Sequence, residues 1–310
     1  MLLRVAESFV VDQLSRAQFS NPDWALGFLE RRAAGQPLVL LDVGGYFAPI
    51  LAALCERFSG QVVGVVEDTE NGHRRYERLG KLPCPVFSVA RSPLKQPEDY
   101  LVGQSIVFSA EAIMRSRGDI LHGRQACVIG FGKLGSSIAR TLHAKGIRVV
   151  IYDADPVRMT RALSEGFQVS ANLPGALAGA GVVMCATGNL ALRADDFACL
   201  REGAHIVSVT SSEDELELDA VHDVYHRSPA GTHVTKYSRG EHSFYVMNDG
   251  NAVNFLHGAS VGPFIFLVQA EILAAVARLA QPTEPGFHEV PDHERRAIAR
   301  TWLDRFGQAP

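Results

Sequence analysis

The sequence predicts two α/β domains, each built around a parallel β-sheet. Apolar, β-branched runs that end in turn residues recur along the chain, helical segments with one apolar face lie between them, and the links are short. Continuous apolar runs are typical of strands that are buried on both faces of a parallel sheet. Strands and helices in alternation predict a doubly wound sheet, and 310 residues are enough for two such domains.

The composition indicates a cytoplasmic globular protein. Hydrophobic residues make up 47%, charged residues 21%, and the net charge is -4. No basic stripe is visible, so we expect no nucleic-acid or membrane partner and a small molecule as substrate. Five cysteines without a CxxC pair are typical of a reducing compartment. The apolar run 261–279 carries Gln269 and Glu271, which predicts a packed helix rather than a membrane span.

The N-terminal third shows the alternation first. Strands are expected at 37–45, 61–68 and 84–90, and a helix at 48–60, where a glycine ends it. Residues 1–14 are apolar but interrupted by charges, which predicts an amphipathic helix rather than a signal peptide.

The middle of the chain alternates more regularly. Asp155 is expected to cap a helix that starts at Pro156. The predicted elements are strands at 126–131, 147–153, 182–188 and 204–210, and helices at 133–146 and 156–166.

The last part of the chain predicts a hairpin at 241–256 that turns at Asn248-Asp249-Gly250, followed by a helix at 262–280. The segment 228–240 has no readable role. We therefore expect a substrate domain at 1–119, a Rossmann-type nucleotide-binding domain at 120–257, and C-terminal helices at 258–310 that pack back on the substrate domain.

The strongest motif is VIGFGKLGSSIA at 128–139, in which three glycines follow a strand and open a helix. Gly130 permits the tight turn, Gly132 lets the backbone approach a pyrophosphate, and Gly135 lets the helix sit close to the strand. The helix N-terminus then offers N–H groups to the phosphates. The motif predicts a dinucleotide site, because strand, loop and helix follow in the required order.

An acid and a second turn extend this site. Asp153 ends the next strand, where a carboxylate accepts the ribose hydroxyls and repels a 2′-phosphate, which favours NAD over NADP. Thr187, Gly188 and Asn189 follow a further strand, at the edge of the sheet that the cofactor must cross. On its own this turn is equally compatible with an ordinary strand end.

The same segment resembles the NAD-binding domain of S-adenosylhomocysteine hydrolase. Residues 123–170, followed by ATGN and GAHIVSV, keep that family's motifs in order and spacing. The similarity extends over about residues 60–257 and is specific over 120–190. The resemblance implies NAD as cofactor and the following NAD-binding residues: Thr69, Gly130, Gly132, Lys133, Leu134, Gly135, Asp153, Thr187, Gly188, Asn189 and Asn254.

The resemblance also implies catalytic residues. VEDTENG at 66–72 is similar to the family's E-E-T-T-T-G, which places Asp68 at a substrate-contacting acid, and 92–103 is similar to its lysine–aspartate stretch, which carries Lys95 and Asp99. Hydride transfer from an alcohol needs a base for the hydroxyl proton, and a lysine serves if its pKa falls toward neutrality. Without the resemblance, a surface ion pair is the better interpretation of Lys95 and Asp99, because such pairs are common.

The resemblance therefore implies an NAD-dependent enzyme that oxidises a secondary alcohol of a small, nucleoside-derived or other polar substrate, with elimination or epimerisation as further steps. The active site is expected in the cleft between the domains. The alternatives are a shortened adenosylhomocysteinase, an ordinary dehydrogenase that releases NADH, and a non-catalytic NAD-binding sensor. Val43 argues against the first, because it stands where that family has an acid. His222 and His226 lack a third ligand, so no metal is expected. The apolar C-terminal helix favours a homodimer.

Overall fold

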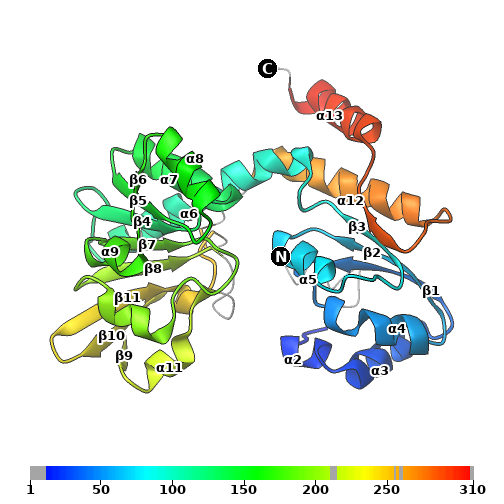
Figure 1. The fold of residues 1–310 in the computed structure, drawn as a ribbon, viewed down its shortest axis with the longest axis horizontal. Helices are drawn as coiled ribbons and strands as arrows, with labels where there is room; N and C mark the ends of the chain where they lie inside the picture. Colours follow the sequence, from blue (N-terminus) through cyan, green and yellow to red (C-terminus); the bar gives the residue numbers. More distant parts are fainter. Residues whose placement is uncertain (1–11, 210–214, 255, 258–260, 308–310) are drawn as a thin grey trace. The chain divides into compact units, whose positions relative to one another are not determined.

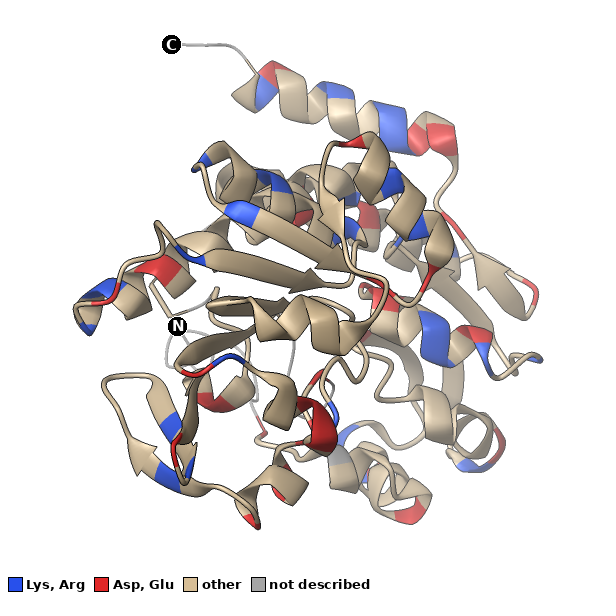
Figure 2. Ribbon diagram, turned by 60° about the vertical axis from the view of Figure 1, so that its left-hand side comes forward, with Lys and Arg blue, Asp and Glu red and all other residues tan. Residues whose placement is uncertain are grey.

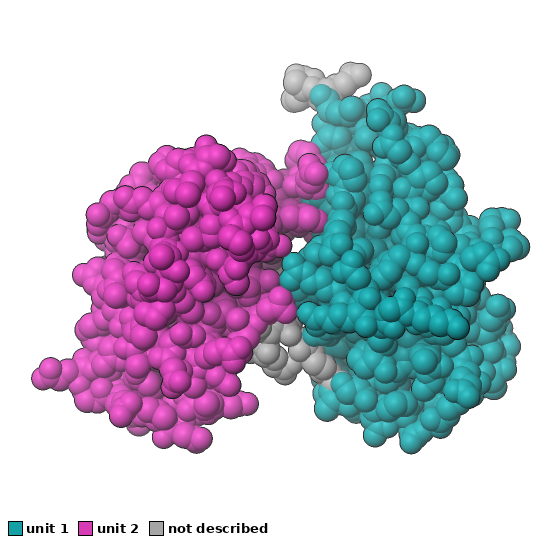
Figure 3. Space-filling view, in the orientation of Figure 1, with its two compact units in different colours: residues 1–95, 265–310 teal, residues 96–264 magenta. Residues whose placement is uncertain are grey.

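The chain forms two compact units in the computed structural model, which describes residues 12–209, 215–254, 256–257 and 261–307. Unit 1 comprises residues 1–95 and 265–310, and unit 2 comprises residues 96–264 (Figure 3). The unit boundary thus falls at residue 95 rather than at the expected 119, because the helix that starts at Gln96 packs against the helix after the glycine loop. The helix expected at 1–14 lies almost entirely outside the described residues.

Unit 1 is built on a four-stranded parallel sheet in the order β1-β2-β3-β12 (Figure 1). The three strands expected in the N-terminal third are confirmed. The bounds of the unit's elements are α2 Arg16–Phe19, α3 Pro22–Ala33, β1 Pro37–Asp42, η1 Ala48–Ile50, α4 Leu51–Arg57, β2 Gln61–Glu67, α5 Glu70–Glu77, β3 Pro85–Ser88, η2 Pro93–Lys95, α12 Ile265–Leu279, β12 Gly286–His288 and α13 Asp292–Phe306.

Helices cover both faces of this sheet. On one face Leu51 and Leu54 of α4 join Leu40, Val65 and Val86 of the strands in a buried cluster. On the other face α12 packs on the sheet through a second cluster, composed of Val66, Phe87, Ala275, Leu279 and Val290. Burial on both faces explains why these strands read as continuous apolar runs.

Unit 2 is built on an eight-stranded sheet in the order β6-β5-β4-β7-β8-β11-β10-β9. The strands from β6 to β11 are parallel, and β10 and β9 add antiparallel pairs at one edge. The bounds are α6 Gln96–Ser116, β4 Gln125–Ile129, α7 Lys133–Ala144, β5 Arg148–Tyr152, α8 Pro156–Ser164, β6 Gln168–Val169, α9 Leu173–Ala178, β7 Val182–Cys185, η3 Ala194–Cys199, β8 Ala204–Ser208, α11 Leu218–His222, β9 His226–Pro229, β10 Val234–Arg239, β11 His242–Met247, η4 Asn248–Gly250 and η5 Gly262–Phe264.

The central strand β4 shows how this sheet is packed. Val128 belongs to a buried cluster with residues of α6 and α7, whereas Cys127 and Ile129 belong to a second cluster with α9 and η3. Side chains alternate between the faces of a strand, so β4 is covered by helices on both sides. The expected α/β fold is confirmed: the sheet of unit 1 is parallel, and the sheet of unit 2 is parallel except for the antiparallel pairs of β9 and β10 at one edge.

The hairpin prediction was wrong in its position. Strands β10 and β11 pair antiparallel and turn at Gly240-Glu241, while Asn248–Gly250 forms the short helix η4. Gly240 has a φ of +59°, which a glycine adopts without strain. Asn248 and Asp249 also have left-handed φ values, but they lie after β11 and do not connect it to β10. The Asn-Asp-Gly sequence therefore marks a turn, but not the turn of the hairpin. The segment 228–240 supplies most of β9 and β10.

Charged residues of both signs are interspersed over the two units, and single helices such as α13 carry both signs (Figure 2). Among the described residues, Gly262–Leu279 is the one helical segment that is long and apolar enough to cross a membrane, which taken alone is weak evidence. In the structure this segment contributes Ala275 and Leu279 to the core of unit 1 and buries Glu271.

Candidate functional site

The glycine loop of unit 2 joins β4 to α7 at the carboxyl edge of the sheet, and each glycine meets a different constraint. Gly130 has a φ of +93°, and a Cβ there would lie 2.7 Å from the Ala186 carbonyl oxygen. A Cβ on Gly135 would lie 1.9 Å from the Gly130 carbonyl oxygen. A Cβ on Gly132, by contrast, would have only one described atom within 4 Å apart from its chain neighbours, which is Arg158 Nη1 at 3.7 Å. Gly132 therefore leaves open the space that a pyrophosphate needs.

Helix α7 begins with N–H groups that a ligand can use. Its N-cap residue is Gly132, which has no side chain to accept a hydrogen bond. Helices α8 and α9 are capped in the usual way, by the side chains of Asp155 and Asn172. The first N–H groups of a helix need partners, and phosphate oxygens are suitable acceptors for those of α7.

Asp153 is held against the glycine loop. Its Oδ2 accepts a hydrogen bond from Phe131 N at 2.6 Å, and its Oδ1 accepts one from Asp155 N at 2.9 Å. A carboxylate has about four acceptor positions, so it can still accept two ribose hydroxyls. Arg158 Nη1 lies 3.6 Å from Asp153 Oδ2, a neighbour that the sequence did not predict.

The turn of Thr187, Gly188 and Asn189 follows β7 and lies beside the glycine loop. A Cβ on Gly130 would be only 3.2 Å from Thr187 Cα. The Thr187 hydroxyl accepts a hydrogen bond from Asn189 N at 2.9 Å. Glu215 Oε1 accepts one from Gly188 N at 2.7 Å. The acidic sequence around Glu215 is typical of a solvated turn, but Glu215 itself is fully buried.

Asn254 supports the prediction of a nicotinamide contact. The residue is 8% exposed, and its side-chain Oδ1 has no hydrogen-bond partner among the described residues. A buried polar atom without a partner is costly, which points to a ligand that supplies the missing donor. The carboxamide of nicotinamide has such a donor. The loop, Asp153 and Asn254 thus fit NAD.

Unit 1 carries a second group of polar side chains, at the carboxyl ends of β1 and β2. Asp42 accepts hydrogen bonds from Tyr46 N and Phe47 N, each at 3.0 Å, and from Tyr76 OH at 2.6 Å. Glu67 accepts hydrogen bonds from Gly45 N at 3.0 Å and Thr69 N at 2.6 Å. Burial, with the nearby Asp42 charge, raises the pKa of Glu67 to about 7. The two acids fix the loops that follow the strands.

Lys95 and Asp68 form an ion pair on these loops. The distance from Lys95 Nζ to Asp68 Oδ1 is 2.7 Å, and the two side chains are 11% and 21% exposed. The structure therefore joins Lys95 to Asp68, whereas the sequence reasoning paired it with Asp99. Asp99, in the first turn of α6, has its Oδ2 3.6 Å from Lys133 Nζ. Thr69 caps α5 and donates its hydroxyl to Glu67.

A buried network holds the turn that carries Lys95. The Ser92 hydroxyl accepts a hydrogen bond from Leu94 N at 3.1 Å and donates one to Glu271 of α12. Glu271 is fully buried and also accepts a hydrogen bond from Arg295 Nε of α13 at 2.6 Å. The C-terminal helices thus position Lys95 through Ser92. The sequence showed none of these contacts.

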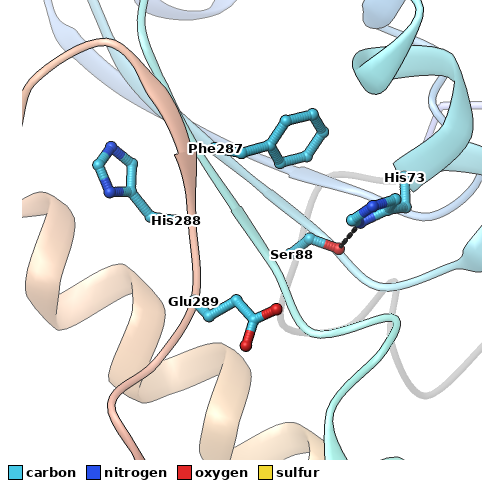
Figure 4. A pocket seen from close by; sticks show the side chains of 5 residues that line it. All are labelled: His73, Ser88, Phe287, His288 and Glu289. Carbon is cyan, nitrogen blue, oxygen red and sulfur yellow. Dashed lines mark hydrogen bonds between the residues drawn. The ribbon is translucent and has the colours of Figure 1, made fainter.

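A small pocket of about 180 Å³ lies at the carboxyl end of β3, lined by His73, Ser88, Phe287, His288 and Glu289 (Figure 4). His73 Nδ1 lies 2.8 Å from Ser88 Oγ, and the pKa of His73 is lowered by burial and by Arg91. His73 lies on α5, and its side chain is only 12% exposed. Nothing at this pocket identifies a ligand.

The fold and the glycine loop define an NAD-binding α/β enzyme. The sequence model described as "S-adenosyl-L-homocysteine hydrolase, NAD binding domain" matches residues 99–260, which is more than half of the chain. The chain belongs to the S-adenosyl-L-homocysteine hydrolase family, as its resemblance indicated, and NAD is its cofactor.

Two curated relatives show the range of the family. The adenosylhomocysteinase of Thermotoga maritima is 28% identical over 284 residues, covering 88% of this chain and 69% of that protein. The S-inosyl-L-homocysteine hydrolase of Methanopyrus kandleri is 26% identical over 297 residues, covering 90% and 68%. A phosphoglycerate oxidoreductase from Vibrio cholerae is similar in structure, with a TM-score of 0.46 and 18% identity over 66% of this chain and 69% of that one.

Proposed function

We propose that the protein oxidises a secondary hydroxyl of a small, nucleoside-derived substrate, with NAD as hydride acceptor and Lys95 as the base. The observation that carries the proposal is the ion pair of Lys95 with Asp68, 2.7 Å long and largely buried. A largely buried carboxylate within hydrogen-bond distance of a lysine can take the lysine's proton, and the lysine can then act as the base.

The proposed step uses the chain's own residues as follows. Lys95 first passes its own proton to Asp68, which lies 2.7 Å from Nζ, and then accepts the hydroxyl proton at Nζ. Glu271 and Ser92 fix the turn on which Lys95 lies. When bound at the glycine loop, NAD would supply the acceptor for the hydride that leaves the hydroxyl-bearing carbon. The product is a ketone, whose neighbouring C–H is acidified, and elimination at that position would release a thiol from a thioether substrate.

The relatives suggest which thioethers to test. One is named for hydrolysis of an S-adenosyl compound and another for an S-inosyl compound. S-adenosyl-L-homocysteine and S-inosyl-L-homocysteine are therefore the first substrates, with release of the homocysteine thiol and formation of reduced nicotinamide as readouts. Turnover of the first by the wild type would favour an adenosylhomocysteinase.

The Lys95→Ala variant tests the proposed base. We expect turnover to fall by about 10²–10⁴-fold, the usual contribution of a general base, while NAD affinity stays unchanged. The exposed Lys81 provides the matched control, and Lys81→Ala should turn over like the wild type. Reduced nicotinamide that forms as fast in Lys95→Ala as in the wild type would contradict the proposal. A protein that binds NAD but acts on no substrate would instead be a sensor.

A further inference from the structure

Glu215 has a place in the cofactor site that its sequence context conceals. It is fully buried, and each of its carboxylate oxygens receives hydrogen bonds from the turn after β7. Oε1 accepts from Gly188 N at 2.7 Å, and Oε2 accepts from the Thr187 hydroxyl at 2.9 Å and from Thr187 N at 3.3 Å. A buried carboxylate with three donors fixes their positions strongly.

The backbone around Glu215 is attached to the same turn. The Glu215 carbonyl oxygen accepts hydrogen bonds from Ala191 N at 2.8 Å and Leu192 N at 3.1 Å, and Glu217 N donates to Leu192 O at 3.0 Å. Leu192 and Leu216 form a parallel bridge. Glu215 thus lies on a short ladder that keeps its side chain directed at Thr187 and Gly188.

The order of the strands shows which half of NAD lies at this turn. Asp153, the ribose acid, ends β5 on one side of β4, and the Thr187 turn follows β7 on the other side. A dinucleotide crosses the sheet edge at this point, with its pyrophosphate on the glycine loop. Since the adenosine half lies toward β5, the nicotinamide half lies toward β7.

We propose that Glu215 is a positioning residue that holds the turn of Thr187, Gly188 and Asn189 in the geometry that binds the nicotinamide half of NAD. The side chain acts through the turn, because its oxygens are occupied by Thr187 and Gly188. The inference depends on NAD binding alone and not on the reaction proposed above.

ADP-ribose provides a sharp test, because it contains the adenosine, the pyrophosphate and the second ribose but no nicotinamide. Glu215→Gln puts an amide N–H₂ where a carboxylate oxygen accepted hydrogen bonds. In calorimetric titrations we expect this variant to bind NAD about tenfold more weakly than the wild type, as loss of a hydrogen bond to a charged group implies, and to bind ADP-ribose within about twofold. Exposed Glu241 is the matched control, and Glu241→Gln should bind both ligands normally.

Equal losses for NAD and ADP-ribose, or no loss for either, would overturn the inference. A measurement on the wild type covers the case in which the variant fails to fold. Hydrogen–deuterium exchange should show residues 187–192 and 215–218 becoming protected together when NAD binds, and much less when ADP-ribose binds. Equal protection by the two ligands would also overturn it.

Discussion

Two side chains of opposite charge stand beside the second glycine of the loop. We expect Asp153 to accept ribose hydroxyls, and Arg158 Nη1 lies 3.6 Å from its carboxylate and 3.7 Å from the Cβ position of Gly132. An acid at this point excludes a 2′-phosphate, whereas a nearby arginine can bind one. We therefore expect the preference for NAD over NADP to depend on the charge of Asp153.

Asp153→Asn should shift the cofactor preference. Removal of the negative charge weakens the hold on the ribose hydroxyls and leaves Arg158 to attract a 2′-phosphate. We expect NAD affinity to fall about tenfold, the loss of one charge-assisted hydrogen bond, and NADP to bind more tightly than in the wild type, as titration calorimetry can measure. The control is Asp153→Asn with Arg158→Ala, which should lose the gain for NADP. An unchanged ratio of the two affinities would show that Arg158 does not reach the phosphate.

At the scale of elements, two glycines next to α7 differ in what they affect: we expect Gly135 to matter for stability and Gly132 for ligand binding. A Cβ on Gly135 would lie 1.9 Å from the Gly130 carbonyl oxygen, so Gly135→Ala must push α7 away from β4. Gly132 has a φ of -77° and open space at its Cβ position. A methyl group there meets the cofactor rather than the protein.

We therefore predict opposite outcomes for the two alanine variants. Gly135→Ala should lower the free energy of unfolding by about 1–3 kcal/mol, the usual cost of overpacking, and lose NAD binding with it. Gly132→Ala should unfold within about 0.5 kcal/mol of the wild type but bind NAD at least about tenfold more weakly. Thermal unfolding and NAD titration of both variants check this. Normal NAD binding by Gly132→Ala would mean that the pyrophosphate lies elsewhere.

The sequence was sufficient wherever a local pattern determines the structure. The strand–loop–helix order around Gly130, the cap at Asp155 and the acid at Asp153 were all predicted, because each depends on neighbours within one βαβ unit. The turn of β10 into β11 was misplaced because Asn248-Asp249-Gly250 carries a stronger turn signal than Gly240-Glu241.

Contacts between distant residues could not be predicted in the same way. Lys95 meets Asp68 across 27 positions, and Ser92 meets Glu271 across 179, through packing that no local pattern encodes. Glu215 lies in an acidic run of the sequence. The composition of such a run does not distinguish a solvated turn from a segment with a buried acid that accepts three hydrogen bonds, as Glu215 does. For such residues burial decides the role, and burial depends on the whole fold.

At the scale of the molecule, each unit buries an ionisable group whose pKa is shifted to a value between about 4 and 7. In unit 2, burial lowers the pKa of His205 to about 4. In unit 1, burial raises the pKa of Glu67 to about 7. A lowered pKa in the native state, as for His205, makes folding less favourable as the pH falls. A raised pKa, as for Glu67, makes folding less favourable as the pH rises.

The two units should therefore respond to pH in opposite directions. As the pH falls from 6.5 to 4, the unfolded chain protonates His205 before native unit 2 does, so unit 2 loses up to about 3 kcal/mol relative to His205→Phe. As the pH rises from 4.5 to 7, Glu67 ionises first in the unfolded chain, so unit 1 loses a similar amount relative to Glu67→Gln. Hydrogen exchange in β8 and in β2 measures the two separately. Parallel pH profiles of wild type and variant would contradict either part.

Unit 1 is discontinuous in the sequence, and this affects the order in which the nascent chain can fold. When the ribosome has released residue 264, all of unit 2 has been made, but β12 and the helices that flank it have not. Strand β3 then still has an unpaired edge, and Ser92 still lacks Glu271. Domains fold as units during synthesis, so the half that binds the cofactor is complete before the half that carries Lys95. A ribosome that stops early therefore releases a chain that has the dinucleotide loop but no finished lysine site.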